Sequence, residues 1–362
     1  MTVRFGGIAL FILVALTLRV DRSAAQETPK TPATPEVVVS ADGSLAVPAQ
    51  QVPLSSYLSP EAKAYVAQHL KDMKDPAATG QENGIPRFMM GYLERQRVLY
   101  PVKMDDTRIA GVHVYVFTPE GGVKPGNAGR VLINLHGGGF SGCWPGCALL
   151  ESIPIAASGG YKVVSVDYRE GPANKFPAAS EDVAAVYAEL LKKYAPGSVG
   201  IYGCSAGGAL TGMSLAWFQT HGLPVPGAAG IFCAGTGSFQ GGDAAYTALP
   251  LGEARVTSPN SKGMPPMGYL AGTNPNDPLV TQAGHPEVLA KFPPTLVITG
   301  TRDFAMSNAI STQLQLAKAG VPAQLFVWEG LFHGFFYNAD VPESRDAYAI
   351  ICGFFDRNLG VR

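Results

Sequence analysis

The sequence predicts an α/β fold in which a mostly parallel central sheet is covered by helices on both faces. Short, continuous apolar runs alternate along the chain with longer amphipathic segments. Continuous apolar strands are typical of a parallel sheet buried on both faces, and their alternation with helices predicts one layered domain. The 362 residues are 46% hydrophobic and 15% charged, a composition that indicates a large core rather than a disordered chain.

Residues 1–25 have the pattern of a secretory signal peptide. A positively charged start precedes an apolar run from Ile8 to Leu18, and the small residues Ser23 to Ala25 follow at a position suited to cleavage. We therefore expect an exported protein, periplasmic or secreted, with cleavage near Ala25; an uncleaved anchor is the alternative. Residues 26–53 are rich in proline and threonine, which predicts an extended leader or linker. Residues 54–362 then form the α/β domain.

The charge pattern narrows the class of partner. The net charge is −1 at pH 7, and the basic residues form no run or stripe, so nucleic-acid binding is not expected. The apolar run from Ile8 to Leu18 is short for a membrane span. We therefore expect no stable membrane partner.

Five cysteines bear on the export hypothesis, because disulfides form in oxidising compartments. Cys143 and Cys147 lie four positions apart in a loop that also contains Trp144 and Pro145. A bridge between the two cysteines is one interpretation. Two buried thiols are the alternative, since spacing does not define connectivity. Metal binding is disfavoured, because no second pair of Cys or His occurs at ligand spacing.

Two regions are expected to cover the sheet rather than join it. In residues 54–100, Ser59 is a suitable helix N-cap, Pro60 suits the first helical position, and apolar residues follow at helical spacing. This region precedes the first clear strand, so it predicts a cap over a functional site. Residues 235–290 interrupt the later alternation with many glycines and prolines, and predict an insertion over one face of the sheet.

The other strand and helix signals alternate in order. Short apolar runs predict strands, and apolar side chains that recur on one face predict helices, as in residues 181–194. The predicted strands cover residues 112–117, 131–135, 162–166, 199–202, 228–233, 295–299 and 324–328. The further predicted helices begin near Ala209 or cover residues 307–319 and 343–359.

The stretch Tyr202–Gly208 carries Gly-x-Ser-x-Gly between a strand-like run and a helix-like run. In a nucleophile elbow the serine occupies a sharp strand-to-helix turn, and the neighbours Gly203, Ala206 and Gly207 are small. The N–H of Ala206 would face the same side as the Ser205 hydroxyl, at a helix N-terminus where negative charge is favoured. A glycine-rich turn without chemistry is the alternative in a chain with 43 glycines.

A second glycine-rich stretch, His136–Phe140, follows a predicted strand directly. Glycines let the backbone approach a ligand closely, and acyl transfer needs N–H donors aimed at the developing oxyanion. The alternative is a dinucleotide-binding fingerprint over residues 137–142, but Pro145 and the two cysteines interrupt the segment where its helix should open. The expected oxyanion donors are the N–H groups of Gly138, Gly139 and Ala206.

A carboxylate and a histidine follow two late strands. Asp303 ends a buried strand, and side chains at the carboxyl ends of parallel strands line the crevice of an α/β sheet; helix capping is the alternative role. Asp277, in a proline-rich loop, is a second candidate acid. His333 is flanked by glycine and aromatic residues and is the candidate base.

The other histidines are expected to be structural: His69 on a helix surface, His113 facing out of a strand, His136 ordering the glycines, His221 ending a helix and His285 in the insertion.

Ser205, Asp303 and His333 follow one another in the chain order of the α/β-hydrolase triad. In such a triad His333 takes the proton of Ser205 and later returns it to the leaving group. Asp303 holds the imidazole in the required tautomer and stabilises its charged form. Three features in one order, each after a predicted strand, favour catalysis over any single structural interpretation.

On these motifs the sequence resembles the bacterial hormone-sensitive-lipase-like branch of the α/β-hydrolases, over about residues 112–359. The resemblance implies an α/β-hydrolase fold with a lid from the N-terminal region and a sheet insertion. It also implies a carboxylic ester hydrolase that acts on a small-molecule ester without cofactor or metal. The matching stretches are His136–Phe140, Val166–Arg169, Phe176–Ala178, Glu181-Asp182, the Ser205 elbow, Phe292–Thr295, Gly300–Asp303 and Leu331–Phe335.

The sequence departs from this branch at three places. Cys204 precedes the serine where aspartate is common, Glu170–Ala173 replaces the usual Leu-Ala-Pro-Glu, and the loop Ser141–Cys147 is unusual. These departures concern acyl specificity rather than the triad. The candidates for the substrate pocket are Phe140, Trp144 and Cys204.

Three functions are compatible with this machinery. A serine carboxylesterase for short or medium acyl chains is favoured, because no long apolar lid helix indicates long-chain lipids. A lactonase or amidase would use the same residues through the same acyl-serine chemistry. A non-catalytic small-molecule binder on a hydrolase fold is the third possibility, and the intact His333 argues against it.

Overall fold

A computed structural model describes residues 36–237, 241–256 and 268–360 of the chain. It separates the chain into two units, Met1–Val52 and Pro53–Arg362. The predicted signal peptide lies outside the described residues. In the described part of the predicted leader, strand β1 (Val38–Val39) pairs with β2 (Leu45–Ala46) as an antiparallel ribbon.

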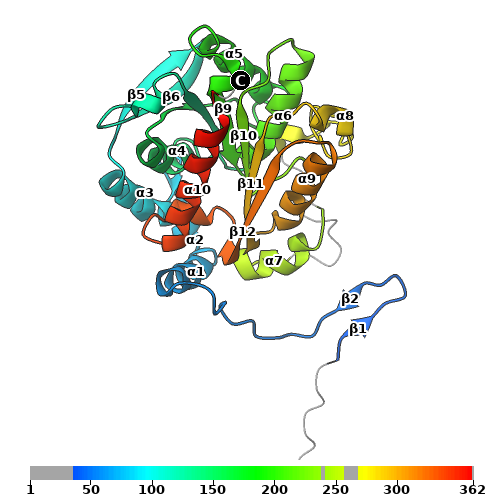
Figure 1. Ribbon diagram of the computed structural model, residues 1–362. Coiled ribbons are helices and arrows are strands. Elements are labelled where there is room, and N and C mark those ends of the chain that lie inside the picture. Colours follow the sequence, from blue (N-terminus) through cyan, green and yellow to red (C-terminus); the bar gives the residue numbers. More distant parts are fainter. Residues whose placement is uncertain (1–35, 238–240, 257–267, 361–362) are drawn as a thin grey trace, which may run out of the picture. The chain divides into compact units, whose positions relative to one another are not determined.

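The second unit is built on an eight-stranded sheet with the order β12-β11-β10-β9-β7-β8-β6-β5. The pairs from β12 to β8 are parallel, whereas β6 is antiparallel to both β8 and β5. The predicted mostly parallel sheet is therefore confirmed (Figure 1). The strands are β5 (Val102–Ile109), β6 (Val112–Pro119), β7 (Val131–Leu135), β8 (Lys162–Val166), β9 (Val199–Cys204), β10 (Ala228–Phe232), β11 (Thr295–Arg302) and β12 (Ala323–Phe332).

Helices cover both faces of this sheet, as predicted. Successive side chains of a strand point to opposite faces, so Leu132 joins one hydrophobic core while Val131 and Ile133 join the other. Helices α4 (Gly146–Gly159) and α10 (Pro342–Asn358) supply the first core, and α10 crosses in front of the sheet in Figure 1. The second core is covered by α5 (Ala178–Leu190), α6 (Ala206–Thr220) and α9 (Met306–Lys318).

Two elements carry no clear signal in the sequence. β5 pairs along its whole length with β6, yet its interior residues are exposed and, apart from Met104, polar, so it lacks the apolar run that predicts a strand. α4 is buried on nearly all sides, so its apolar residues do not mark one face. Both elements are defined by their neighbours in the sheet and the core rather than by local periodicity.

The remaining elements lie at the ends of the central strands or in the insertion. The predicted helix after Ser59 is α1 (Pro60–Asp72), and the Ser59 hydroxyl accepts a hydrogen bond from the N–H of Ala62 at 3.0 Å. The described part of residues 235–290, predicted to be loop-rich, contains α7 (Ala244–Glu253), which packs against β11 and β12. The others are α2 (Pro76–Thr79), β3 (Gln81–Glu82), β4 (Ile85–Pro86), α3 (Arg87–Leu99) and α8 (Pro286–Leu289).

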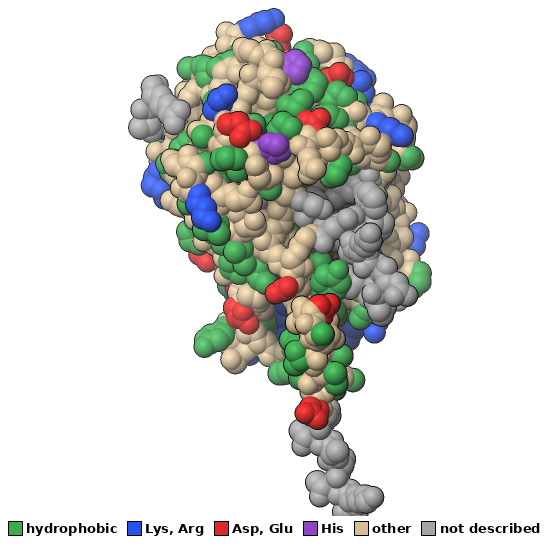
Figure 2. All heavy atoms as spheres, turned by 90° about the vertical axis from the view of Figure 1, so that its right-hand side faces the viewer, with side chains coloured by type: hydrophobic (Ala, Val, Ile, Leu, Met, Phe, Trp, Pro, Cys, Tyr) green, Lys and Arg blue, Asp and Glu red, His purple; other side chains and the backbone are tan. Residues whose placement is uncertain are grey.

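Within the described ranges, no helix combines the length and the hydropathy that a membrane crossing requires. On the face shown in Figure 2, acidic and basic side chains are dispersed among one another.

Candidate active site

Ser205 occupies the sharp turn between β9 and α6. Its backbone lies at φ 57° and ψ −121°, a conformation that a non-glycine residue adopts only where the surroundings enforce it. Added Cβ atoms at Gly203 or Gly207 would meet the carbonyl oxygen of Leu135. Small residues on both sides of the serine are therefore required by the close approach of β7, and the hydroxyl is carried at the carboxyl end of the sheet.

His333 and Asp303 come together from the ends of β12 and β11. The Nδ1 atom of His333 lies 2.8 Å from Oδ1 of Asp303. Asp303 is fully buried, and its carboxylate also accepts hydrogen bonds from the Thr299 hydroxyl and from the N–H of Ala305, both at 2.8 Å. The imidazole stacks on Phe304 with 4.2 Å between ring centroids. These contacts hold the histidine with Nδ1 toward the carboxylate and leave Nε2 for other partners.

The charges of this pair stabilise each other. Burial alone would raise the pKa of Asp303, but the charge of His333 and the three hydrogen bonds bring it below the ordinary value. Burial would lower the pKa of His333, whereas the charge and hydrogen bond of Asp303, with a smaller effect of Glu253, raise it. Nearby opposite charge therefore outweighs desolvation at both groups.

The glycine loop, residues 136–140, follows β7 and runs beside the serine. Gly138 and Gly139 have φ of 120° and 65°, and a Cβ at Gly138 would meet the carbonyl oxygen of Gly142. Only glycine suits this backbone. Both residues line the same cavity as Ser205 and His333. Ala206 is the first residue of α6, where backbone N–H groups have no partner within the helix.

The catalytic cavity, as we call it, has a volume of about 300 Å³. Its floor carries the serine, the histidine and the glycine loop. Its walls come largely from the cap region of residues 54–100, through α1 and α3, and from α7. Its lining includes Tyr65, His69, Cys143, Cys147, Glu253 and Phe332.

Comparison with known proteins identifies the fold family. A family model described as the alpha/beta hydrolase fold matches residues 132–337. The chain belongs to this α/β-hydrolase family. The match includes the glycine loop, the serine turn, Asp303 and His333, and it confirms the predicted resemblance.

Individual relatives of this hydrolase agree with the family match. An acetyl-hydrolase from Streptomyces hygroscopicus is 31% identical over 234 residues, which cover 64% of this chain and 77% of the relative. The crystal structure of the esterase E25 is 28% identical with a TM-score of 0.74, over 87% of this chain and 99% of that one. An esterase from the bacterial hormone-sensitive lipase family, 24% identical with a TM-score of 0.67 over 82% and 99% of the two chains, shows the same fold.

A buried glutamate of α4 supports the glycine loop of the hydrolase. Glu151 accepts a hydrogen bond from the N–H of Gly137 at 2.9 Å, from Nδ2 of Asn134 at 2.9 Å and from the Tyr337 hydroxyl at 2.8 Å. Burial raises the pKa of Glu151 to about 7 despite these hydrogen bonds. The sequence gives no sign of this role, because Glu151 lies inside an apolar helix far from any motif.

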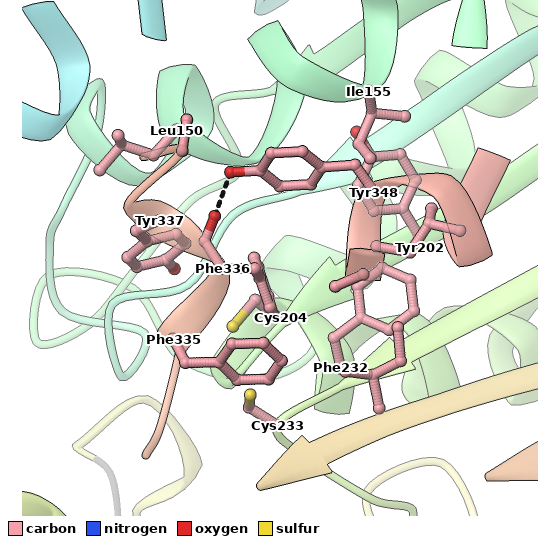
Figure 3. Packing of buried hydrophobic residues seen from close by; sticks show 14 of the residues in the cluster. Leu150, Ile155, Tyr202, Cys204, Phe232, Cys233, Phe335, Phe336, Tyr337 and Tyr348 are labelled. Atoms are coloured by element: carbon pink, nitrogen blue, oxygen red, sulfur yellow. Dashed lines mark hydrogen bonds between the residues drawn. The ribbon is translucent and has the colours of Figure 1, made fainter. Parts of the chain in front are cut away.

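The three predicted pocket residues lie elsewhere, and this prediction is corrected. Phe140 is fully buried and stacks on Tyr269 with 4.8 Å between centroids. Trp144 packs against Tyr115 with 4.6 Å between ring centroids. Cys204 points into the core, where Figure 3 shows its sulfur near that of Cys233. Phe140 and Cys204 are buried in the core and Trp144 packs on Tyr115, so none of the three lines the catalytic cavity.

Cys143 and Cys147 are joined by a disulfide. The bridge closes the loop that connects the glycine loop to α4, and both cysteines line the catalytic cavity. The other three cysteines, Cys204, Cys233 and Cys352, are free and buried.

The remaining sequence candidates have structural positions. Asp277 accepts a hydrogen bond from the N–H of Leu279 at 2.9 Å within a turn. His136 is buried and donates from Nδ1 to the carbonyl of Gly137 at 2.7 Å, and burial lowers its pKa to about 4. His113 forms hydrogen bonds with Asp106 and Asp167. His221 is the C-cap residue of α6, and His285 is the N-cap residue of α8. The surface position predicted for His69 is wrong, since the side chain is buried in the catalytic cavity wall.

One group of side chains has the donor atoms for a metal ion. The ligand atoms of Cys233, Asp303 and His333 lie within 4.8 Å of one another. Asp303 and His333 already bond to each other, and Cys233 accepts a hydrogen bond from the N–H of Gly334 at 3.3 Å. These hydrogen bonds therefore already engage all three groups within the protein.

Proposed function

We propose that the protein is a serine hydrolase that cleaves carboxylic esters through an acyl-serine intermediate, with Ser205, His333 and Asp303 as its triad. The observation that carries this proposal is the shared cavity of Ser205 and His333, with His333 Nδ1 held 2.8 Å from the buried Asp303. The esterase and acetyl-hydrolase activities of the relatives support the same reaction class.

Each residue has a defined part in this reaction. The Ser205 hydroxyl attacks the ester carbonyl and transfers its proton to Nε2 of His333, while Asp303 holds Nδ1–H and stabilises the imidazolium. The N–H groups of Gly138, Gly139 and Ala206 stabilise the oxyanion, and each such donor is worth about 3–4 kcal/mol in comparable sites. His333 then protonates the leaving alcohol, and water, deprotonated by His333, releases the acid from the serine.

The cavity favours short or medium acyl chains. Its volume of about 300 Å³ is at the lower end of ordinary small-molecule sites. The walls are mainly aromatic side chains and methionines, which suit an apolar acyl or alcohol part.

Export is a separate proposal that rests on residues 1–25. The disulfide between Cys143 and Cys147 supports it, since such bridges persist in oxidising compartments. Mass spectrometry of the protein recovered from the periplasm or the medium should find a mature N-terminus near residue 26. A retained N-terminus on an intracellular protein would contradict export.

Serine labelling tests the enzymatic proposal directly. A fluorophosphonate should label the wild-type protein once, and Ser205→Ala should abolish both labelling and hydrolysis of 4-nitrophenyl butyrate while circular dichroism stays unchanged. Ser214→Ala is a matched control, because Ser214 is a buried serine of α6, the helix that follows Ser205, and lies outside the cavity. Turnover that persists in a folded Ser205→Ala protein would refute the assignment.

A further inference from the structure

We infer that the catalytic cavity contains a polar subsite, formed by His69 and Glu253, that binds a hydroxyl group of the ester substrate. The inference deepens the proposed function and rests on it. Both residues line the cavity that Ser205 and His333 share. Neither belongs to the triad, the glycine loop or the disulfide loop.

His69 is held rigidly in the cavity wall. It lies near the end of α1 and is only 4% exposed. Its ring stacks on Phe332, the neighbour of His333, with 3.6 Å between centroids and 4° between planes. Phe88 of α3 packs on the imidazole in an edge-to-face arrangement, with 6.0 Å between ring centroids. Aromatic packing therefore fixes the plane of the imidazole and contributes no hydrogen bond to its nitrogens.

The two ring nitrogens of His69 have unused hydrogen-bonding capacity. Among the residues that the structure describes, no atom forms a hydrogen bond with Nδ1 or Nε2. Buried polar groups are hydrogen-bonded in the great majority of cases, and leaving one unpaired is costly. A buried imidazole in a cavity wall is thus suited to pair with an atom of the bound ligand.

Glu253 supplies the second polar group. Its Oε1 atom lies 3.9 Å from Nε2 of His69, a separation too long for a direct hydrogen bond. Glu253 is the last residue of α7, where the helix dipole disfavours negative charge. Helix stability therefore does not account for a glutamate at this position, whereas a role in the cavity does.

The chemistry of this pair selects a hydroxyl group. A hydroxyl can accept a hydrogen bond from an imidazole N–H and donate one to a carboxylate. A carboxylate on the substrate would be repelled by Glu253, and a purely apolar chain would leave His69 unpaired. Sites built to hydrogen-bond a substrate hydroxyl discriminate strongly against the analogue that lacks it. The inferred substrate class is an ester with a hydroxylated acyl or alcohol chain.

Two matched substrate pairs test the inference. The first pair places the hydroxyl on the acyl side and compares 4-nitrophenyl 6-hydroxyhexanoate with 4-nitrophenyl hexanoate. The second pair places it on the alcohol side and compares 6-hydroxyhexyl acetate with hexyl acetate. The wild type should prefer the hydroxylated member of at least one pair by about 10-fold or more in kcat/KM. His69→Phe, which retains the stacking, and Glu253→Gln should each reduce this ratio toward one.

His221→Phe is the matched control. His221 also stacks on an aromatic ring, Trp217, at 3.8 Å near a helix end, but it lies outside the catalytic cavity. Its variant should keep the wild-type ratio. The inference is overturned if the wild type shows no preference in either pair, or if the preference survives in both His69→Phe and Glu253→Gln.

A binding measurement separates this inference from the proposed function. Calorimetry with folded Ser205→Ala protein compares methyl 6-hydroxyhexanoate with methyl hexanoate, and 6-hydroxyhexyl acetate with hexyl acetate, without turnover. Tighter binding of a hydroxylated ester, lost in Ser205→Ala/His69→Phe, supports the subsite even if the wild type hydrolyses no ester. Equal binding within both pairs overturns the subsite even if the wild type is an active esterase.

Discussion

The carboxylate of Glu151 accepts a hydrogen bond from the backbone N–H of Gly137 at 2.9 Å. This contact joins α4 to the first glycine of the loop that carries the proposed oxyanion donors. The same oxygen accepts a hydrogen bond from the Tyr337 hydroxyl at 2.8 Å. The segment that follows His333 is therefore bound to the same carboxylate as the glycine loop. Glu151 is therefore a positioning residue, because it acts through the loop and does not touch the reacting atoms.

Removing this carboxylate should lower activity. Glu151→Ala leaves the Gly137 N–H and two buried side-chain donors unpaired, at about 1–3 kcal/mol for each group. We expect kcat with 4-nitrophenyl butyrate to fall by about 10- to 100-fold while KM changes less, since a displaced loop weakens mainly the oxyanion interaction. Glu151→Gln should retain more activity, because the amide oxygen can still accept from Gly137. Glu189→Gln, at a surface position, is the control and should have wild-type kinetics. Wild-type kinetics in Glu151→Ala would contradict the positioning role of Glu151.

Glu151 should also make stability depend on pH. Burial raises its pKa from 4.5 to about 7, so the folded protein binds this proton more tightly than the unfolded chain. The contribution to stability is complete below pH 4.5 and is lost as the pH rises through 7, reaching a loss of about 3 kcal/mol. Urea unfolding at pH 4.5 and pH 8 should show this loss in the wild type relative to Glu151→Gln. Parallel pH profiles for the two proteins would exclude it.

The pH dependence of hydrolysis should report on His333. The base must be neutral to accept the Ser205 proton, so activity falls as the pH falls through its pKa. That pKa is raised above 6.5 because the charge and hydrogen bond of Asp303 outweigh burial. The acid limb of kcat/KM should therefore have its midpoint above pH 6.5, and a midpoint below that value would be inconsistent with the pairing.

Asp303→Asn should reduce kcat by about 10⁴-fold, because the imidazole of His333 is then no longer held in the required tautomer.

The disulfide between Cys143 and Cys147 should stabilise the fold. The closed loop is short, so chain entropy gives a contribution of about 2 kcal/mol. Dithiothreitol should lower the free energy of unfolding of the wild type by this amount. The Cys143→Ser/Cys147→Ser variant should not respond, because the three other cysteines are already reduced. An equal effect of dithiothreitol on both proteins would rule out the bridge as its target.

Local sequence was sufficient for the central strands and the chemistry-bearing turns. Strands at residues 131–135 and 162–166 were predicted with the observed bounds, since continuous apolar runs have one stable place in a parallel sheet. The helix predicted from about Ala209 starts at Ala206, because Ser205 itself forms the turn. Glycine spacing identified both turns, since their backbones exclude larger residues.

Residues that act through long-range contacts had no such signal. His69 shares the buried face of α1 with Ala62, Tyr65 and Val66, so its helical spacing is compatible with burial. Nothing local indicates that Phe332 and Phe88, from distant segments, pack on its ring. Glu151 sits among apolar residues of α4 and finds its partners on β7, the glycine loop and the segment after β12. The sequence predicts Phe140, Trp144 and Cys204 as pocket residues, but Phe140 and Cys204 are buried in the core and Trp144 packs on Tyr115.

The amino-acid pattern thus determined the layered sheet, the order of serine, acid and base, and the glycines that only a sharp turn tolerates. These depend on backbone sterics and on hydrophobic periodicity, which act over a few residues. The wall of the cavity, with His69 and Glu253 3.9 Å apart across 184 positions of sequence (253 − 69), was determined by tertiary packing. Which side chains meet there depends on how α1, α3 and α7 close over the sheet, and no local pattern encodes that contact.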